Sequence, residues 1–281
     1  MIMKDYKITF IGGGNMAKSL IGGLVSNGID PHHITVTDLN LDNLQSLVIQ
    51  YPSLTVSGDN IKAVQSADVI MLAIKPQQLQ SVAKALAGHF PSDALFISIA
   101  AGIRSDDIAH WLGQEGIAIV RAMPNTPALV QAGATGLYAN SAVTTTQYEL
   151  AETILRAVGL ALWVEDEDKI DLVTALSGSG PAYYFLVMEA MEAAAIEMGL
   201  APETARLLCL QTAFGAAKMA LESNESTATL RERVTSPAGT TERALHELED
   251  GGLRGLFENA LVAAALRSRE LAQQLGQDDA N

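Results

Sequence analysis

The glycine-rich stretch FIGGGNMA, residues 10–17, is the feature that most constrains the fold. It follows the β-rich run KITFIG (7–12) and opens a run with helical spacing. In such a turn the first glycine permits a tight bend, the second lets the backbone approach a pyrophosphate, and a small third residue lets helix and strand pack closely. The helix N-terminus then faces the negative charge. The pattern predicts a dinucleotide site formed by Gly12, Gly13, Gly14, Asn15, Met16 and Ala17, and the alternative is a plain glycine turn.

The segments that follow alternate between strand-like and helix-like patterns. Continuous apolar runs closed by Gly, Pro or a polar residue occupy residues 34–38, 67–76, 95–102 and 118–124. Such runs are typical of parallel strands covered on both faces. Two further runs, 135–140 and 162–165, are expected to be the last, edge strands. The fold class is therefore predicted to be α/β, with an N-terminal Rossmann-type dinucleotide-binding domain.

The strand-like runs stop near residue 166, and the rest of the chain is helical. Helices are expected over residues 181–199, 203–223, 241–250 and 253–275. The first is apolar on nearly every side, so it must be covered by its own domain or by another subunit. We predict a Rossmann NAD(P)-binding domain over 1–163 and an all-helical domain over 164–281. No Pro- or Gly-rich linker marks the boundary.

Composition excludes several classes of function. There are 32 acidic and 18 basic residues, giving a formal charge of −14, which argues against nucleic acid or an anionic membrane as partner. Cys209 is the single cysteine and the five histidines lack the spacing of a zinc site, so no disulfide or metal centre is expected. With neither a signal peptide nor a membrane-spanning run in the sequence, a cytoplasmic protein is expected.

Several candidate residues follow strands at the edge where ligands bind open α/β sheets. Asp38 could accept a ribose 2′-hydroxyl, face solvent or cap the next helix. Lys75 ends a strand just before Pro76, and is either functional or a solvated charge. The motif IAAG (99–102) ends another strand. Asn125, held between prolines, could meet the nicotinamide carboxamide or the substrate, or form a rigid turn.

The helical half contains two further motifs. The turn SGSGP (177–181) opens a long helix, yet no Lys or Arg lies between Pro181 and Ala205. A hydroxyacid dehydrogenase of similar layout would use a lysine on this helix to polarise the reacting oxygen, so its absence argues against that class. The segment SPAGTT (236–241) supplies backbone amides at a helix start, with hydroxyls from Ser236, Thr240 and Thr241. It fits a small carboxylate ligand, although a plain capped helix is the alternative.

Together these motifs resemble Δ1-pyrroline-5-carboxylate reductase. The similarity runs over nearly the whole chain through FIGGGNMA, DVIMLAIKP, SIAAGI, VRAMPNTPALV, DLVTALSGSGPAY and VTSPAGTTERALHELE, in that order. The resemblance implies an oxidoreductase that transfers hydride from NADPH or NADH to the C=N carbon of 1-pyrroline-5-carboxylate, giving L-proline. It also implies that the C-terminal helical domain binds substrate and forms a homodimer or a ring of dimers, with the site facing the nicotinamide across a seam between subunits.

The resemblance also assigns roles to individual residues. Residues 12–17 hold the pyrophosphate, and the cofactor is flanked by Asn60, Ala73, Lys75, Ala101 and Gly102. Glu167 is expected beside the substrate. The backbone amides of Gly239 and Thr240 take the carboxylate and the Thr241 hydroxyl reaches the ring nitrogen, so Thr241 and Ser236 are the catalytic candidates.

Two departures from the family pattern bear on this assignment. Ala238 stands where the family usually has a second glycine, which would tighten the loop. Arg233 can touch the cofactor and favour NADPH, whereas Asp38 favours NADH, so the sequence leaves the cofactor preference open. The rival hypotheses are a β-hydroxyacid-type dehydrogenase and a non-catalytic NAD(P)-binding redox regulator.

Overall fold

A computed structural model of the chain describes residues 6–276. The chain divides into two compact units. One runs as far as Ser179 and includes the segment from Ala263 onward, and the other is Gly180–Val262. The domain boundary between residues 163 and 164 stays a prediction.

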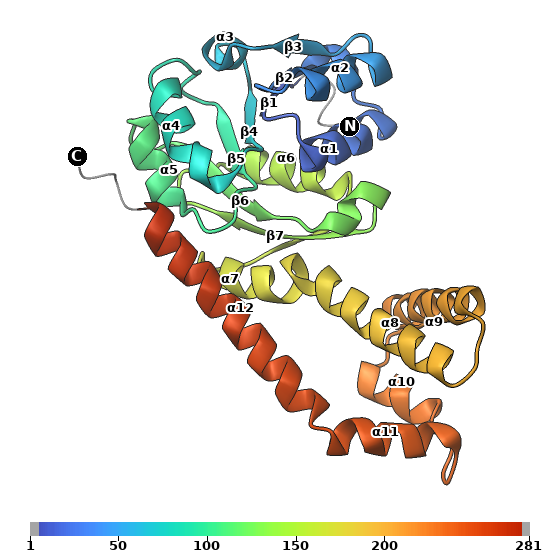
Figure 1. Cartoon of the computed structure of the whole chain (residues 1–281). Coiled ribbons are helices and arrows are strands. Elements are labelled where there is room, and N and C mark those ends of the chain that lie inside the picture. Colours follow the sequence, from blue (N-terminus) through green and yellow to red (C-terminus); the bar gives the residue numbers. More distant parts are fainter. Residues whose placement is uncertain (1–5, 277–281) are drawn as a thin grey trace. The chain divides into compact units, whose positions relative to one another are not determined.

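The first unit is built on a sheet in which eight strands of the described chain run in the order β3-β2-β1-β4-β5-β6-β7-β8 (Figure 1). All neighbours pair in parallel except β6 and β7. The strand order reverses between β1 and β4, and ligands bind open α/β sheets at such a point. The strands are β1 (Ile8–Ile11), β2 (Ile34–Thr37), β3 (Thr55–Ser57), β4 (Val69–Leu72), β5 (Leu95–Ser98), β6 (Ala118–Met123), β7 (Gly133–Ala139) and β8 (Gly159–Trp163).

Successive strand residues point to opposite faces of the sheet, and here both sets are mostly apolar. Helices therefore cover both faces. Ile8 and Phe10 of β1 pack into one buried cluster, with residues of α1 (Asn15–Ser26), α2 (Leu41–Gln50) and α6 (Thr145–Arg156). Ile11 of the same strand packs into the other cluster. The helices on that face are α3 (Asn60–Val64), α4 (Pro76–Leu86) and α5 (Ser105–Leu112). This two-faced burial explains the continuous apolar runs, and it confirms the predicted Rossmann-type fold.

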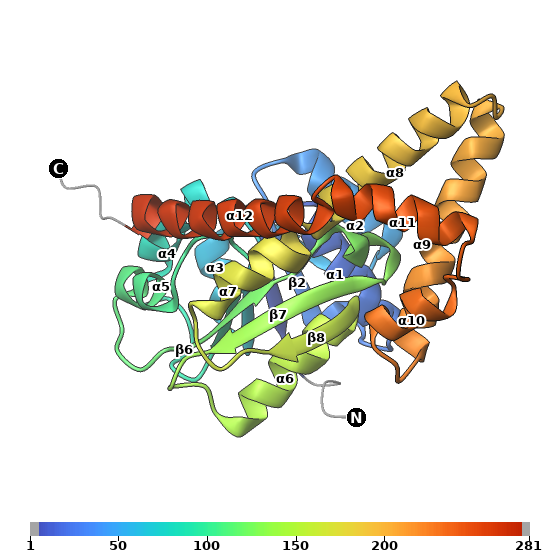
Figure 2. The ribbon, with the colours of Figure 1, turned by 90° about the horizontal axis from the view of Figure 1, so that it is seen from below.

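The last strands differ from the sequence prediction. β7 is not an edge strand, because it lies between β6 and β8, as Figure 2 also shows. β8 does form one edge. The other edge is β3, which the sequence analysis did not identify because it has only three residues, Thr-Val-Ser. The first unit also contains short 3₁₀ helices (Pro31–His33 and Thr126–Val130), α7 (Lys169–Val173) and a π-helical turn (Thr174–Gly178).

The second unit is helical, as predicted. It contains α8 (Gly180–Glu197), α9 (Pro202–Glu222), α10 (Thr227–Arg233), α11 (Thr240–Asp250) and the first part of α12 (Leu253–Gly276), whose second part belongs to the first unit. α8 and α9 lie side by side (Figures 1 and 2).

The apolar surface of α8 remains largely uncovered within the chain. Tyr184, Phe185 and Leu186 are 69%, 64% and 65% exposed. Contiguous exposed apolar surface of this kind marks an interaction site. Among residues 6–276, no helix is long and apolar enough to cross a bilayer.

Candidate active site

The turn between β1 and α1 requires glycine at its first position. Gly12 has φ +102°, and a Cβ placed there would lie 2.3 Å from the carbonyl oxygen of Ala73. The turn is fixed from both neighbouring strand ends. The amide of Gly12 donates to Thr37 O at 2.8 Å, and the amide of Ala73 donates to Ile11 O at 2.8 Å. These two bonds hold the backbone bend at Gly12 in place, at the point where the strand order reverses between β1 and β4.

A pocket of about 470 Å³ lies at this turn. It is bordered by the ends of β1, β2 and β4, by residues of α2 and α4, and by the start of α3. Of the predicted cofactor residues, the structure brings together Gly12, Gly14, Asp38, Asn60, Ala73 and Lys75. The pocket is completed by residues that the sequence analysis did not single out, namely Ile11, Thr37, Leu39, Asn40, Asn43, Gly58, Ile74, Gln78, Ser81 and Val82.

The Asp38 carboxylate is held in place by three donors. Its Oδ2 accepts the amide of Gly13 at 2.8 Å and the side-chain amide of Asn43 at 2.9 Å, and its Oδ1 accepts the amide of Asn40 at 2.8 Å. Partial burial by itself raises the pKa of Asp38, but the hydrogen bonds from Asn40, Asn43 and Gly13 outweigh it, so the pKa is lowered. The group is therefore a carboxylate at neutral pH.

The start of α1 is suited to an anion. Asn15, Met16 and Ala17 are its first residues, and the N-cap residue Gly14 provides no side-chain hydrogen bond. No acidic residue lies in the first turn. The first amides of a helix have no partner within the helix and carry the positive end of its dipole, so these residues can hold a pyrophosphate.

The remaining predicted cofactor residues lie outside the lining of this pocket. Pro76 is the first residue of α4. Ala101 and Gly102 follow β5, and Gly102 has φ +70° and packs against Leu271 of α12. Asn125 follows β6 with its side-chain amide engaged at both ends. It donates to Ser177 O at 3.0 Å and accepts from the amide of Ala134 at 2.8 Å, an arrangement that fixes the turn.

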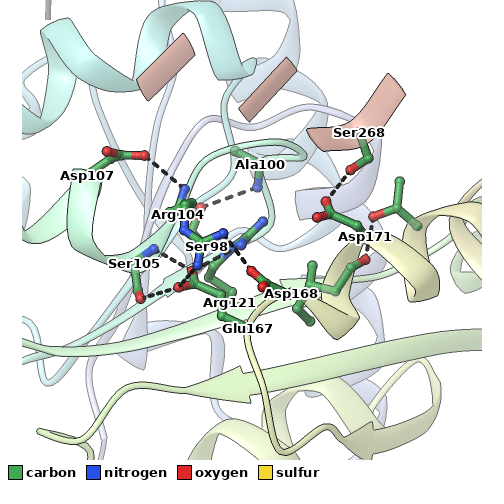
Figure 3. A network of polar contacts seen from close by, with 12 residues as sticks. Ser98, Ala100, Arg104, Ser105, Asp107, Arg121, Glu167, Asp168, Asp171 and Ser268 are labelled. Carbon is green, nitrogen blue, oxygen red and sulfur yellow. Dashed lines mark hydrogen bonds and ion pairs between the residues drawn. The ribbon is translucent and has the colours of Figure 1, made fainter. Parts of the chain in front are cut away.

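Glu167, predicted beside the substrate, lies in a buried network (Figure 3). Its carboxylate accepts the Ser105 amide at 2.6 Å, the Ser105 hydroxyl at 3.1 Å and the Arg121 guanidinium at 3.0 Å. Arg104 lies 3.6 Å from Glu167 and bonds Asp168 at 2.8 Å. The network ties the end of β6 and the start of α5 to the segment before α7.

The same region is joined to α12. Asp171 of α7 is buried and accepts the Ser268 hydroxyl at 2.6 Å. Arg269 lies 3.7 Å from the same carboxylate (Figure 3 shows the serine). The last part of α12 is thereby fixed to the first unit through a polar contact as well as through the packing of Leu271 on Gly102.

Four of the five predicted substrate residues lie together in the second unit, whereas Glu167 lies in the first unit. Gly239 is the N-cap of α11 and provides no side-chain cap, while Thr240 and Thr241 are the first helical residues. Ser236 is in the preceding turn, where its carbonyl accepts the Gly239 amide at 3.0 Å. The segment is exposed on the chain. The Thr240 and Thr241 amides at this helix start can bind a carboxylate. The Gly239 amide is already bonded to Ser236 O, and the first turn also contains the acidic Glu242.

Ala238 has φ +57°, in the left-handed region. That conformation costs a non-glycine residue roughly 1–2 kcal/mol. Its amide donates to Glu242 at 2.8 Å, which contributes to holding the turn. The departure from glycine at this position therefore places local strain beside the helix start. Arg233, the other departure, is in an ion pair with Glu225 of the same unit.

Two kinds of signal could have identified the residues that were missed. Arg121 is a charged residue inside the apolar strand AIVRAM, and a buried arginine requires a buried acid. Asn40 is the N-cap of α2, where a short polar side chain accepts a neighbouring backbone amide, and Asn43 in the first turn of α2 donates to the Asp38 carboxylate. The contacts themselves depend on tertiary packing.

The fold and the pocket define a Rossmann-type dinucleotide-binding protein with an added helical unit. Residues 7–102 match a family model described as NADP oxidoreductase, coenzyme F420-dependent, and residues 167–271 match one described as pyrroline-5-carboxylate reductase dimerisation. Pyrroline-5-carboxylate reductase from Pseudomonas aeruginosa is 50% identical over 98% of this chain and 100% of its own length. That from Methanosarcina acetivorans is 41% identical over 97% of this chain and 100% of its own. The chain belongs to the pyrroline-5-carboxylate reductase family.

Solved structures agree with this assignment. A pyrroline-5-carboxylate reductase from Coxiella burnetii superposes with a TM-score of 0.90 at 50% identity, covering 95% of this chain and 98% of its own. A Plasmodium falciparum pyrroline carboxylate reductase, solved with NADP bound, gives a TM-score of 0.85 at 29% identity, covering 96% and 99%.

Replacing Glu167 with glutamine should destabilise the protein by about 3–5 kcal/mol, because it leaves the buried Arg121 charge without its counter-ion. Urea denaturation of the full chain measures the change. Asp168→Asn is the matched control, because its partner Arg104 is 44% exposed and such a pair contributes about 1 kcal/mol or less. Equal stability of the two variants would contradict the role assigned to the buried network.

Proposed function

We propose that this chain catalyses the NAD(P)H-dependent reduction of 1-pyrroline-5-carboxylate to L-proline, the last step of proline biosynthesis. The observation that carries the proposal is the 50% identity, over 98% of the chain, to a protein named for this reaction. The pocket at the strand-order reversal and the uncapped start of α11 support it, because the reaction needs a dinucleotide and a small carboxylate.

The cofactor would be held by the first unit. Of the predicted residues 12–17, the amides at the start of α1 would bind the pyrophosphate. The Gly12 and Gly13 amides already donate to Thr37 O and to the Asp38 carboxylate, so these two glycines would contribute close backbone approach. Asp38 lies on the side of the adenine ribose. Asn60, at the start of α3 after β3, would flank the cofactor on the Asp38 side. On the other side of the glycine turn, the proposed nicotinamide side is flanked by Ala73, Lys75, Pro76, Ala101, Gly102 and Asn125.

The substrate would be held by the second unit. The Thr240 amide would bind its carboxylate at the positive end of α11. The Gly239 amide, assigned the same role by the resemblance, would have to share its bond to Ser236 O with the ligand. The Thr241 hydroxyl would donate to or accept from the ring nitrogen, and Ser236 would line the same turn. The contact of Glu167 with the substrate, expected from the resemblance, stays a prediction, since the protein itself supplies the three bonds to its carboxylate.

The chemistry of an imine explains why such a simple site suffices. A protonated C=N nitrogen makes the adjacent carbon electrophilic. The bound cofactor would supply a hydride to this carbon, and the C=N π electrons would become the nitrogen lone pair of proline. The cofactor supplies the hydride, and the protein supplies positioning, which is worth several kcal/mol when donor and acceptor atoms are held close.

The direct test is to follow the absorbance of reduced nicotinamide after adding 1-pyrroline-5-carboxylate. We expect consumption of cofactor with formation of an equal amount of L-proline. Cofactor binding without consumption would favour the redox-regulator rival. Oxidation of a small β-hydroxyacid with NAD as acceptor, in place of imine reduction, would favour the dehydrogenase rival.

Thr241→Ala should lower kcat/KM roughly tenfold or more, which corresponds to the loss of one hydrogen bond to a charged or polar atom. Thr235→Ala is the matched control, because that hydroxyl donates to Arg231 O at 2.6 Å in α10 instead of facing the helix start. If both variants retain wild-type kinetics, Thr241 is not part of the site.

We further propose that the chain forms a homodimer, or a ring of dimers, in the cytoplasm. The match of residues 167–271 to the dimerisation model and the exposed apolar side chains of α8 support association. Light scattering coupled to size exclusion should give a mass of at least two chains. A single-chain mass at micromolar concentration would contradict the proposal.

A further inference from the structure

The residues after β2 form the adenosine side of the proposed cofactor pocket. Asp38, Leu39, Asn40 and Asn43 all line it, and Asp38 is placed where a ribose 2′-hydroxyl would lie. The three donors on Asp38 keep its carboxylate from rotating away. Oδ1 accepts one of them and retains a lone pair for a ligand hydroxyl.

Within residues 6–276, the negative charge of the Asp38 carboxylate is not neutralised by a cation beside it in the lining of the pocket. Among the described residues that line it, Asp38 and Lys75 are the charged ones. Lys75 follows β4, whereas Asp38 follows β2, and β1 lies between them. Neighbouring strands are about 4.8 Å apart, so the two strand ends are separated by roughly 10 Å.

Another cation on the same side of the turn is already engaged. Lys18 donates to the side-chain oxygen of Asn43 at 3.1 Å, and Asn43 in turn donates to Asp38. Lys18 is not among the residues that line the pocket. This chain of contacts steadies the carboxylate but presents no cationic group to a ligand at the ribose.

NADH and NADPH would meet this environment differently. The 2′-hydroxyl of NADH can donate a hydrogen bond to Asp38. The 2′-phosphate of NADPH carries about −1.5 to −2 charges near neutral pH and offers acceptor oxygens. It would face a carboxylate of the same sign, and the described residues that line the pocket include no arginine, which NADP-binding sites of this fold place near the ribose. The pKa of Asp38 is lowered by its donors, despite burial, so protonation does not relieve the repulsion near neutral pH.

We propose that this chain binds NADH in preference to NADPH, and that Asp38 is the residue that sets the preference. This inference rests on the proposed function, which places the reduced dinucleotide in this pocket. The Plasmodium falciparum relative was solved with NADP bound, so the preference is attributed to the residues after β2 in this chain and not to the family.

Calorimetric titration of the full-length protein with NADH and with NADPH, without substrate, tests the inference. We expect NADH to bind at least tenfold more tightly, a difference of about 1.4 kcal/mol. Equal binding, or tighter binding of NADPH, would overturn the preference and leave the proposed function intact. Binding of neither nucleotide would overturn the proposed function, and the preference with it.

Variants assign the effect to particular residues. Asp38→Asn should bring the two Kd values within about threefold of each other. Asp42→Asn is the matched control, because Asp42 is exposed in the first turn of α2 and does not line the pocket. It makes the same change in net charge and should keep the wild-type ratio. A ratio that Asp38→Asn leaves unchanged, or that both variants shift equally, would overturn the role of Asp38.

A second variant keeps the test decisive if Asp38→Asn disturbs the glycine turn. Leu39 lines the pocket with an 89% exposed side chain, so Leu39→Arg adds a cation beside the ribose without opening the core. It should tighten NADPH binding at least fivefold relative to NADH. No change in the ratio would show that the 2′ position does not lie at the end of β2, and the inference would fail.

Discussion

The close approach of β1 to the end of β4 at Gly12 is the constraint on which the rest of the first unit depends. A side chain at this position would collide with the carbonyl of Ala73, and the φ of +102° is strained for any other residue. The open turn allows α1 to begin next to the strand-order reversal. It also brings the Gly13 amide to Asp38, so one backbone bend determines both where α1 begins and the position of the acid.

A second constraint holds the part of the unit beyond the pocket. Arg121, Glu167 and Ser105 come from three different segments and share one buried set of bonds. Breaking the ion pair would destabilise the fold, because Arg121 or Glu167 left alone would be a buried charge without an opposite charge beside it. The loop that contains Ala101 and Gly102 lies between Ser98 and Ser105. It is anchored at one end by the bonds of Ser105 to Glu167, and by the packing of Gly102 against Leu271 of α12.

The sequence predicted the parts of the molecule that depend on local pattern. The glycine turn, the buried strands and the long helices follow from residue types at fixed spacing. β3 was missed because it has only three residues, and β7 was placed at an edge because strand pairing is decided by partners far away in the chain. Glu167 was expected beside the substrate from the resemblance. Its buried bonds to Arg121 and Ser105 could not be inferred from spacing, since the partners lie 46 and 62 residues away. The roles of Thr241 and Ser236 remain predictions of the family pattern.

The central claim is that a reduced dinucleotide lies across the glycine turn between Asp38 and Lys75. A crystal structure of the chain grown with NADH measures this directly. The account predicts the pyrophosphate against the first amides of α1 and a ribose hydroxyl on the Asp38 carboxylate. Density for the nucleotide at another place on the chain, with this turn empty, would contradict it.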